Sequence, residues 1–296
     1  MVARSIRSGA LMTVPGLATA LLVAAIASNL SPASAQAVPA PEEPSVTAGA
    51  PVWVTTMQRL KTMVYESPGR SAHPVLVVVA HGDSPSQPPT YHYRFAARAA
   101  AWLPDVVAAA ILRPGYSDGE DRSDGLRGET TGDNYTPEVV DAVATAISDL
   151  RRRYHPRYVV LVGHSGGAAI MANLLGERGA VADAALLVSC PCDVPAWRRH
   201  MQKLRGGAIW ERPERFLSPQ ALVGGVAAST RIAMLVGAND QTTPPFLTEA
   251  YAEALRGRGV ATEVTVAPDL EHNILLHEMA MRRLKDMVAA APPRPQ

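Results

Sequence analysis

Short apolar runs alternate with longer amphipathic stretches through most of the chain. The apolar runs are rich in Val, Ala and Leu, and they cover residues 75–80, 106–112, 158–163, 184–189, 231–237 and 261–267. Apolar positions at helical spacing lie between these runs, at residues 92–102, 137–153, 167–178, 245–257 and 274–290. Unbroken apolar runs are typical of strands buried on both faces. The alternation therefore predicts a doubly wound, mainly parallel α/β sheet flanked by helices.

Two stretches depart from this alternation. Residues 52–65 carry a weaker pattern, which leaves open antiparallel edge strands or a leading helix. Residues 193–230 form a connection much longer than usual, with helical patches at 197–204 and 219–226. Long connections inside a compact domain are usually functional or form a small subdomain. We therefore expect one α/β domain over residues 51–291 with a short helical, lid-like insertion.

The first 37 residues have the pattern of a secretory signal peptide. Arg4 and Arg7 precede an uncharged stretch at residues 10–27, and two overlapping A-x-A sequences end at Ala35 and Ala37. This order is typical of a segment removed by signal peptidase, which predicts a secreted or periplasmic protein with no stable membrane anchor after cleavage.

The alternative to cleavage is an uncleaved anchor. Pro15 and Gly16 interrupt the apolar stretch, which barely reaches the roughly 18 residues of a spanning helix. Residues 38–50 contain prolines, acids and small residues without apolar periodicity, which indicates a flexible linker.

Composition excludes some functions and leaves open whether the two cysteines form a disulfide. The net charge of +1 on 296 residues provides no basic footprint for nucleic acid. Cys190 and Cys192 are the only cysteines, so a zinc site lacks ligands, whereas a small disulfide and two buried thiols both stay open. A calcium loop from Asp118 to Glu129 is rejected, because Arg122 and Ser123 break the ligand pattern.

The segment 163–167 reads Gly-His-Ser-Gly-Gly and lies between a predicted strand and a predicted helix. A serine on such a tight turn is exposed at the edge of the sheet, and small neighbours permit the strained backbone. The start of the helix offers unpaired N–H groups where an oxyanion would form. The pattern therefore predicts Ser165 as a nucleophile and the Gly166 amide as an oxyanion donor.

With this motif in place, residues 75–290 resemble the α/β-hydrolase family, which orders its catalytic residues as Ser, acid, His. The resemblance implies Asp240, after the 231–237 run, as the acid and His272, after the last strand, as the base. Asp193, after the preceding strand, remains a rival acid, and Asp269 is a weaker one. His164 and His277 are interpreted as structural histidines.

The sequence His81-Gly82 at the end of the 75–80 run resembles the family's oxyanion loop. The chain then continues with Asp83 where better-known members have further glycines, so either the Gly82 or the Asp83 amide remains a potential donor. The segment 113–116, Arg-Pro-Gly-Tyr, resembles a family loop at the rim of the active site.

Together these features predict hydrolysis through an acyl-Ser165 intermediate, which needs no metal or organic cofactor. A small-molecule carboxylic ester is the expected substrate. The alternatives are a peptidase or amidase similar to the prolyl oligopeptidase group, which would act on a peptide, and a non-catalytic relative that binds a ligand.

Overall fold

The computed structural model describes residues 49–55, 58–84, 86–127, 135–211 and 215–293. The predicted signal peptide and nearly all of the predicted linker lie outside these residues. No helix in the described ranges is long and apolar enough to cross a membrane.

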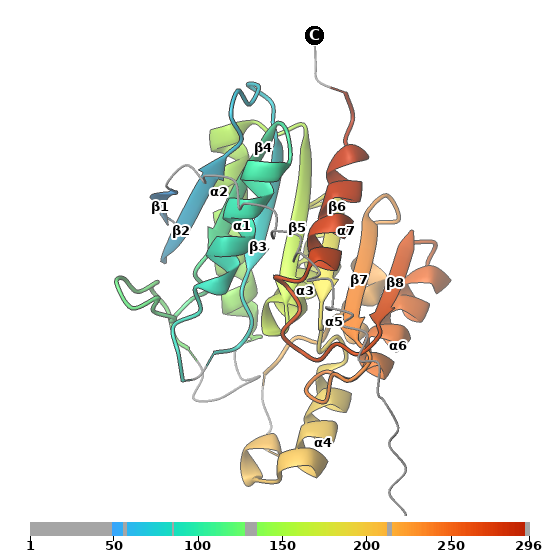
Figure 1. Ribbon diagram of the computed structural model, residues 1–296. Coiled ribbons are helices and arrows are strands. Elements are labelled where there is room, and N and C mark those ends of the chain that lie inside the picture. The colour runs from blue at the N-terminus through green and yellow to red at the C-terminus, as the bar shows by residue number, and fades with distance from the viewer. Residues whose placement is uncertain (1–48, 56–57, 85, 128–134, 212–214, 294–296) are drawn as a thin grey trace, which may run out of the picture. The chain divides into compact units, whose positions relative to one another are not determined.

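An eight-stranded sheet forms the centre of the α/β unit, in the order β1-β2-β4-β3-β5-β6-β7-β8 (Figure 1). The strands are β1 (Ala50–Thr55), β2 (Arg59–Glu66), β3 (Val75–Ala80), β4 (Val106–Ile111), β5 (Tyr158–His164), β6 (Ala184–Val188), β7 (Arg231–Gly237) and β8 (Thr262–Ala267). β1 and β2 pair antiparallel, β2 pairs antiparallel with β4, and the six strands from β4 to β8 pair in parallel. The predicted fold class is therefore confirmed.

Helices cover both faces of the sheet, which explains why its central strands are apolar throughout. The helices that cover the sheet are α1 (Tyr91–Trp102), α2 (Pro137–Tyr154), α3 (Gly166–Arg178), α6 (Pro245–Gly257) and α7 (Glu278–Ala289). α1 and α7 lie on one face and α2, α3 and α6 on the other (Figure 1). In β3, Val77 packs into the α1/α7 core and Val78 into the opposite core, so the two-residue period of the strand feeds both layers.

The weak pattern at residues 52–65 corresponds to β1 and β2, which settles the question that the sequence left open. These two strands lie at one end of the sheet, and the buried positions of β2 include the polar residues Lys61 and Thr62, so no continuous apolar run marks it. The last helix begins at Glu278 rather than at residue 274, because His277 has extended backbone angles and its ring accepts the N–H of Met279. His277 is thus a helix cap.

The 193–230 connection contains α4 (Val194–Arg205), η1 (Ala208–Glu211), α5 (Pro219–Leu222) and η2 (Val223–Gly225). α4 buries Trp197, whose ring meets Trp210 edge-on at 5.5 Å between centroids. The indole N–H of Trp197 donates to the carbonyl oxygen of Thr242 at 2.8 Å. This segment is therefore attached to the loop that follows β7, and its role as a lid remains a prediction.

Cys190 and Cys192 are bonded to each other directly after β6, and both side chains are buried. The disulfide thus lies between the sheet and α4. Of the two states that the sequence left open, the structure contains the bridged one.

Candidate active site

The three residues of the predicted triad meet at the carboxyl-terminal edge of the sheet. Ser165 follows β5, Asp240 follows β7 and His272 follows β8. Because the carboxyl ends of parallel strands share one edge, loops that are far apart in sequence converge there.

Ser165 occupies a strained turn between β5 and α3. Its φ of 52° and ψ of −123° lie outside the favoured regions for an L-residue. Glycines make room for this turn: a Cβ on Gly163 would lie 2.5 Å from the Cα of Ala168, and one on Gly167 would lie 2.4 Å from the carbonyl oxygen of His81. Strained backbone of this kind is concentrated at functional sites.

A continuous line of hydrogen bonds connects the three side chains. His272 Nε2 lies 3.0 Å from Ser165 Oγ. His272 Nδ1 lies 2.9 Å from Asp240 Oδ2 and 3.1 Å from Oδ1. An ionised carboxylate only accepts hydrogen bonds, so Nδ1 carries the ring proton and Nε2 accepts the serine hydroxyl. This is the arrangement in which a histidine can act as a base toward a serine.

Asp240 is buried and held by neighbours besides His272. Thr243 donates its N–H to Oδ1 and its hydroxyl to Oδ2, each at 2.8 Å, and the N–H of Thr242 also reaches Oδ1, at 2.9 Å. Burial acts to raise the pKa of Asp240, but the hydrogen bonds from His272 and Thr243 outweigh it and hold the pKa below its ordinary value. The carboxylate is therefore charged at neutral pH.

The rival acids lie elsewhere. Asp193 is the N-cap of α4, and its carboxylate accepts the N–H of Ala196 at 2.9 Å. Asp269 has an exposed side chain and a positive φ of 58°. Of the three acids considered, the structure brings Asp240 to the ring of His272.

The main chain of His272 is anchored by two residues that the sequence did not single out for the site. Its carbonyl oxygen lies 2.9 Å from Ser189 Oγ and 3.0 Å from His164 Nε2. The other ring nitrogen of His164 lies 2.7 Å from the hydroxyl of Tyr91. His164 is buried, in agreement with its interpretation as a structural, hydrogen-bonded residue. Ser189 directly follows β6, the strand next to β5, and its place at the end of the predicted 184–189 run is the only sequence signal that points to it.

On the other side of Ser165, a buried ion pair supports the loop after β3. Arg113 is fully buried and contacts Asp83 at 2.9 Å, while the hydroxyl of Tyr135 donates to the other Asp83 oxygen at 2.6 Å. The N–H of Arg113 also donates to His81 Nε2, at 3.0 Å. Arg113 is thus fully buried, whereas the sequence resemblance had placed its segment at the rim of the active site.

The candidate oxyanion residues surround the serine closely. A Cβ on Gly82 would lie 2.9 Å from the Cβ of Ser165, and one on Gly166 would lie 2.3 Å from Asp83 Oδ1. The Gly82 N–H donates to the Tyr91 hydroxyl at 2.6 Å. That amide is therefore already engaged, which favours Asp83 over Gly82 as the donor from this loop.

The acidic loop after β4 encloses a lysine. Lys61 Nζ lies 2.8 Å from Asp118 and 2.7 Å from Asp121, and its side chain is only 3% exposed. Glu129, the last ligand of the rejected calcium pattern, lies outside the described residues. Within the described ranges, no group of three or more His, Cys, Asp or Glu side chains is arranged to hold a metal ion.

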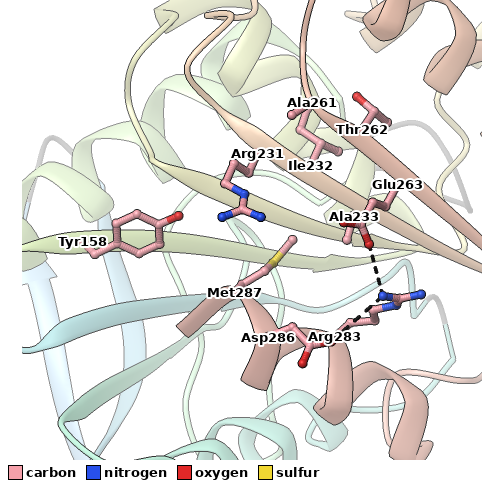
Figure 2. A pocket seen from close by; sticks show the side chains of 10 residues that line it. All are labelled: Tyr158, Arg231, Ile232, Ala233, Ala261, Thr262, Glu263, Arg283, Asp286 and Met287. Atoms are coloured by element: carbon pink, nitrogen blue, oxygen red, sulfur yellow. Dashed lines mark hydrogen bonds and ion pairs between the residues drawn. The ribbon is translucent and has the colours of Figure 1, made fainter. Parts of the chain in front are cut away.

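A pocket of about 110 Å³ lies at the opposite edge of the sheet, and Figure 2 shows the side chains that line it. Tyr158 and Arg231, at the amino ends of β5 and β7, line it, and Arg283 in its wall pairs with Glu263 at 3.1 Å. Because this edge holds the starts of the parallel strands, the pocket is separate from the Ser165 site.

The parallel sheet, the strained serine and the Ser-acid-His order define a serine hydrolase with the α/β-hydrolase fold. The chain belongs to the prolyl oligopeptidase family, whose sequence pattern matches residues 105–289, more than half of its length. No curated protein sequence matches it significantly.

Solved structures with the same fold include both peptidases and esterases. An acylaminoacyl peptidase from Pyrococcus horikoshii aligns with a TM-score of 0.61 and 12% identity, over 85% of this chain but 43% of the peptidase. The esterase Est1E from Butyrivibrio proteoclasticus, with bound ferulic acid, aligns with a TM-score of 0.64 and 12% identity, over 81% of this chain and 98% of the esterase. A Pyrococcus furiosus esterase aligns with a TM-score of 0.60 and 14% identity, over 81% and 92%. The chain thus spans less than half of the first of these relatives, and identities this low establish the fold alone.

Proposed function

We propose that this protein hydrolyses carboxylic esters through an acyl-Ser165 intermediate, with His272 as general base and acid and Asp240 as its orienting carboxylate. The observation that carries the proposal is the hydrogen-bonded line from Ser165 Oγ through His272 to a buried, charged Asp240.

In the first half of the reaction, Ser165 Oγ attacks the carbonyl carbon of the ester while its proton passes to His272 Nε2. The resulting imidazolium is stabilised by Asp240, which keeps its negative charge. The tetrahedral intermediate collapses when the carbon–oxygen bond to the alcohol breaks. His272 then donates its proton to the departing alcohol, which leaves an acyl-Ser165 ester.

In the second half, a water molecule attacks the acyl carbon and gives a proton to His272. The second tetrahedral intermediate breaks its bond to Ser165 Oγ, which recovers the proton from His272, and a carboxylic acid is released. Both intermediates carry an oxyanion, for which the amides of Gly166 and Asp83 are the proposed donors. Gly166 begins α3, so its amide adds the positive end of the helix dipole.

The preference for esters rests on the size-matched relatives. The described hydrolase unit corresponds to nearly the whole of both esterases, whereas it corresponds to less than half of the acylaminoacyl peptidase. The family match supports a second candidate, cleavage of peptide or aminoacyl amide bonds through the same acyl-serine chemistry.

A fluorophosphonate probe tests the nucleophile, because it reacts with an activated serine. We expect wild-type protein to be labelled and Ser165→Ala to be neither labelled nor active. Ser148→Ala, at an exposed position on α2, is the control and should behave as wild type. Labelling of Ser165→Ala at the wild-type rate would contradict the proposal. Parallel assays with short acyl esters and aminoacyl amides then distinguish the two substrate classes.

Export is a separate part of the proposal and rests on residues 1–37. N-terminal sequencing of the protein recovered outside the cytoplasm should begin after Ala35 or Ala37. A mature chain that retains Met1 would contradict cleavage.

The lid role of residues 193–230 belongs to the same proposal, and it rests on their attachment to the loop that carries Asp240.

A further inference from the structure

A chain of hydrogen bonds connects the loop beside the nucleophile to the loop of its base. It starts at the Gly82 N–H, which lies 2.6 Å from the Tyr91 hydroxyl, and continues to His164 Nδ1 at 2.7 Å. From His164 Nε2 it reaches the carbonyl oxygen of His272 at 3.0 Å. We infer that Tyr91 and His164 are positioning residues, which hold the main chain of His272 so that its ring faces Ser165. This inference rests on the proposed function of Ser165 and His272.

The donors and acceptors in this chain have a single consistent direction. A carbonyl oxygen only accepts, so His164 Nε2 carries a proton and donates it to His272. A neutral ring has one N–H, so Nδ1 accepts the hydroxyl proton of Tyr91. The oxygen of Tyr91 in turn accepts the N–H of Gly82. His164 is therefore the tautomer that carries its proton on Nε2.

Burial keeps the hydrogen-bonded relay formed by Tyr91 and His164 neutral. His164 is 3% exposed, and burial, with His272 nearby, lowers its pKa to about 3. Burial likewise raises the pKa of Tyr91 above its ordinary value, although the bond from Gly82 opposes this. Because the ring centroids of His164 and His272 lie 5.2 Å apart, a cationic His164 would oppose the protonation of His272 during catalysis. A neutral His164 holds the loop without this penalty.

Ser189 completes the anchor from the opposite direction. Its hydroxyl donates to the same His272 carbonyl oxygen at 2.9 Å, and the N–H of Ile274 also donates to it at 3.0 Å. Together with His164, these donors hold the peptide group that follows His272, and its orientation limits where the imidazole can point. Misplacement of a reacting group by about 1 Å can reduce the rate about a hundredfold.

The relay has a defined position relative to the nucleophile. Gly82 is so close to Ser165 that a Cβ on it would lie 2.9 Å from the serine Cβ. His164 is bonded directly to Ser165 in the chain. The hydrogen bonds therefore connect the serine, the oxyanion loop and the histidine loop, three segments that separate strands deliver to the site.

The first test compares the hydroxyls of two tyrosines. Tyr91→Phe removes the hydroxyl that connects Gly82 and His164, and we expect kcat to fall about ten- to a hundredfold with KM little changed. Tyr251→Phe is the matched control, because the Tyr251 hydroxyl is buried without a hydrogen-bond partner among the described residues. It should leave kcat unchanged.

The second test separates hydrogen bonding from packing at His164. His164→Gln retains one acceptor and one donor, whereas His164→Phe retains an aromatic ring and loses both. A positioning role predicts that Gln keeps more activity than Phe. A purely structural role predicts the reverse, because Phe preserves the edge-on contact with Tyr91.

The third test needs no substitution. Nitrogen NMR of wild-type protein labelled at histidine should show His164 protonated at Nε2 and unprotonated at Nδ1 at neutral pH. The opposite tautomer, a Tyr91→Phe variant with wild-type kcat, or a Phe variant of His164 more active than Gln, would each overturn the inference. If Tyr91→Phe does not fold, the activities of the two His164 variants and the tautomer of His164 in wild-type protein still test the inference. Failure of this inference can be distinguished from failure of the proposed function, because in the second case wild-type protein would not react with fluorophosphonate.

Discussion

Two groups of buried or partly buried side chains flank Ser165, and they are held together by different interactions. We call His81, Asp83, Arg113 and Tyr135 the Arg113 side, and Ser189, Asp240, Thr243 and His272 the His272 side. On the Arg113 side, a fully buried guanidinium and a carboxylate form an ion pair at 2.9 Å. On the His272 side, one charged carboxylate is surrounded by neutral donors from Thr242, Thr243 and His272.

This difference matches what each side does in the proposed reaction. The Arg113 side supports a loop whose charge does not change, so a fixed ion pair suits it. The His272 side must accept and release a proton, and a second permanent charge there would favour one protonation state. The neutral Tyr91–His164 relay connects the sides without adding charge to either.

The largest expected effect lies on the His272 side. Asp240→Asn should reduce kcat/KM by about 10⁴, because the amide no longer fixes the tautomer of His272. Steady-state ester hydrolysis measures it, with circular dichroism to confirm folding. Asp193→Asn is the control, since asparagine also caps α4, and it should stay near wild type. If Asp193→Asn were the inactive variant, the acid would be misassigned.

The next largest effect, on stability rather than chemistry, lies on the Arg113 side. Arg113→Met should lower the free energy of unfolding by about 3–5 kcal/mol, because it leaves the Asp83 carboxylate buried without its cation. Urea unfolding measures the change. Arg178→Met removes an exposed pair with Asp141 and should cost no more than about 1 kcal/mol. Equal losses in the two variants would remove the distinction between buried and surface pairs.

Three buried histidines near the site predict that acid destabilises the fold. Burial lowers the pKa of His92 and of His164 to about 3 each, and the pKa of His81 well below its ordinary value. Between about pH 6.5 and 3 the unfolded chain therefore binds protons that the folded chain does not. Stability should fall as the pH falls through this range, by about 1.4 kcal/mol per pH unit for each histidine.

Urea unfolding between pH 7 and pH 5 measures this slope. His92→Phe keeps a ring beside Tyr93, which lies 4.2 Å away between centroids, and it removes one of the three titrating groups. Its slope should be shallower than that of wild type. An unchanged slope would mean that His92 does not contribute.

The smallest expected effect comes from the Cys190–Cys192 bond beside Ser189. Because the bond encloses a single residue, its loss should lower the free energy of unfolding by only about 1–2 kcal/mol. Unfolding in dithiothreitol measures the loss. A variant with alanine at both positions should not respond to dithiothreitol, and a response there would show that the reagent acts elsewhere.

The sequence by itself predicted the buried strands and the turn at Ser165, and the resemblance to the α/β-hydrolase family implied the order Ser165, Asp240, His272. The strands and the turn depend on local pattern: continuous apolar runs specify buried parallel strands, and Gly163 and Gly167 permit the conformation of Ser165. The predicted bounds of the strands at 75–80 and 231–237 agree with β3 and β7. The two strands β1 and β2 at one end of the sheet were ambiguous because the polar residues Lys61 and Thr62 occupy buried positions of β2, which therefore has no continuous apolar run.

Only the tertiary structure decided which side chains meet. Asp193 and Asp240 both follow strands, and the sequence alone did not exclude either; in the folded chain one caps a helix and the other contacts His272. His164 and His272 are 108 positions apart, and no periodicity relates them. Such contacts depend on which strand ends lie side by side, and the pairing of strands across the sheet determines this. The tertiary structure also decided the hydrogen-bond partner of the Gly82 N–H. That partner is the hydroxyl of Tyr91, which lies on a separate helix, α1.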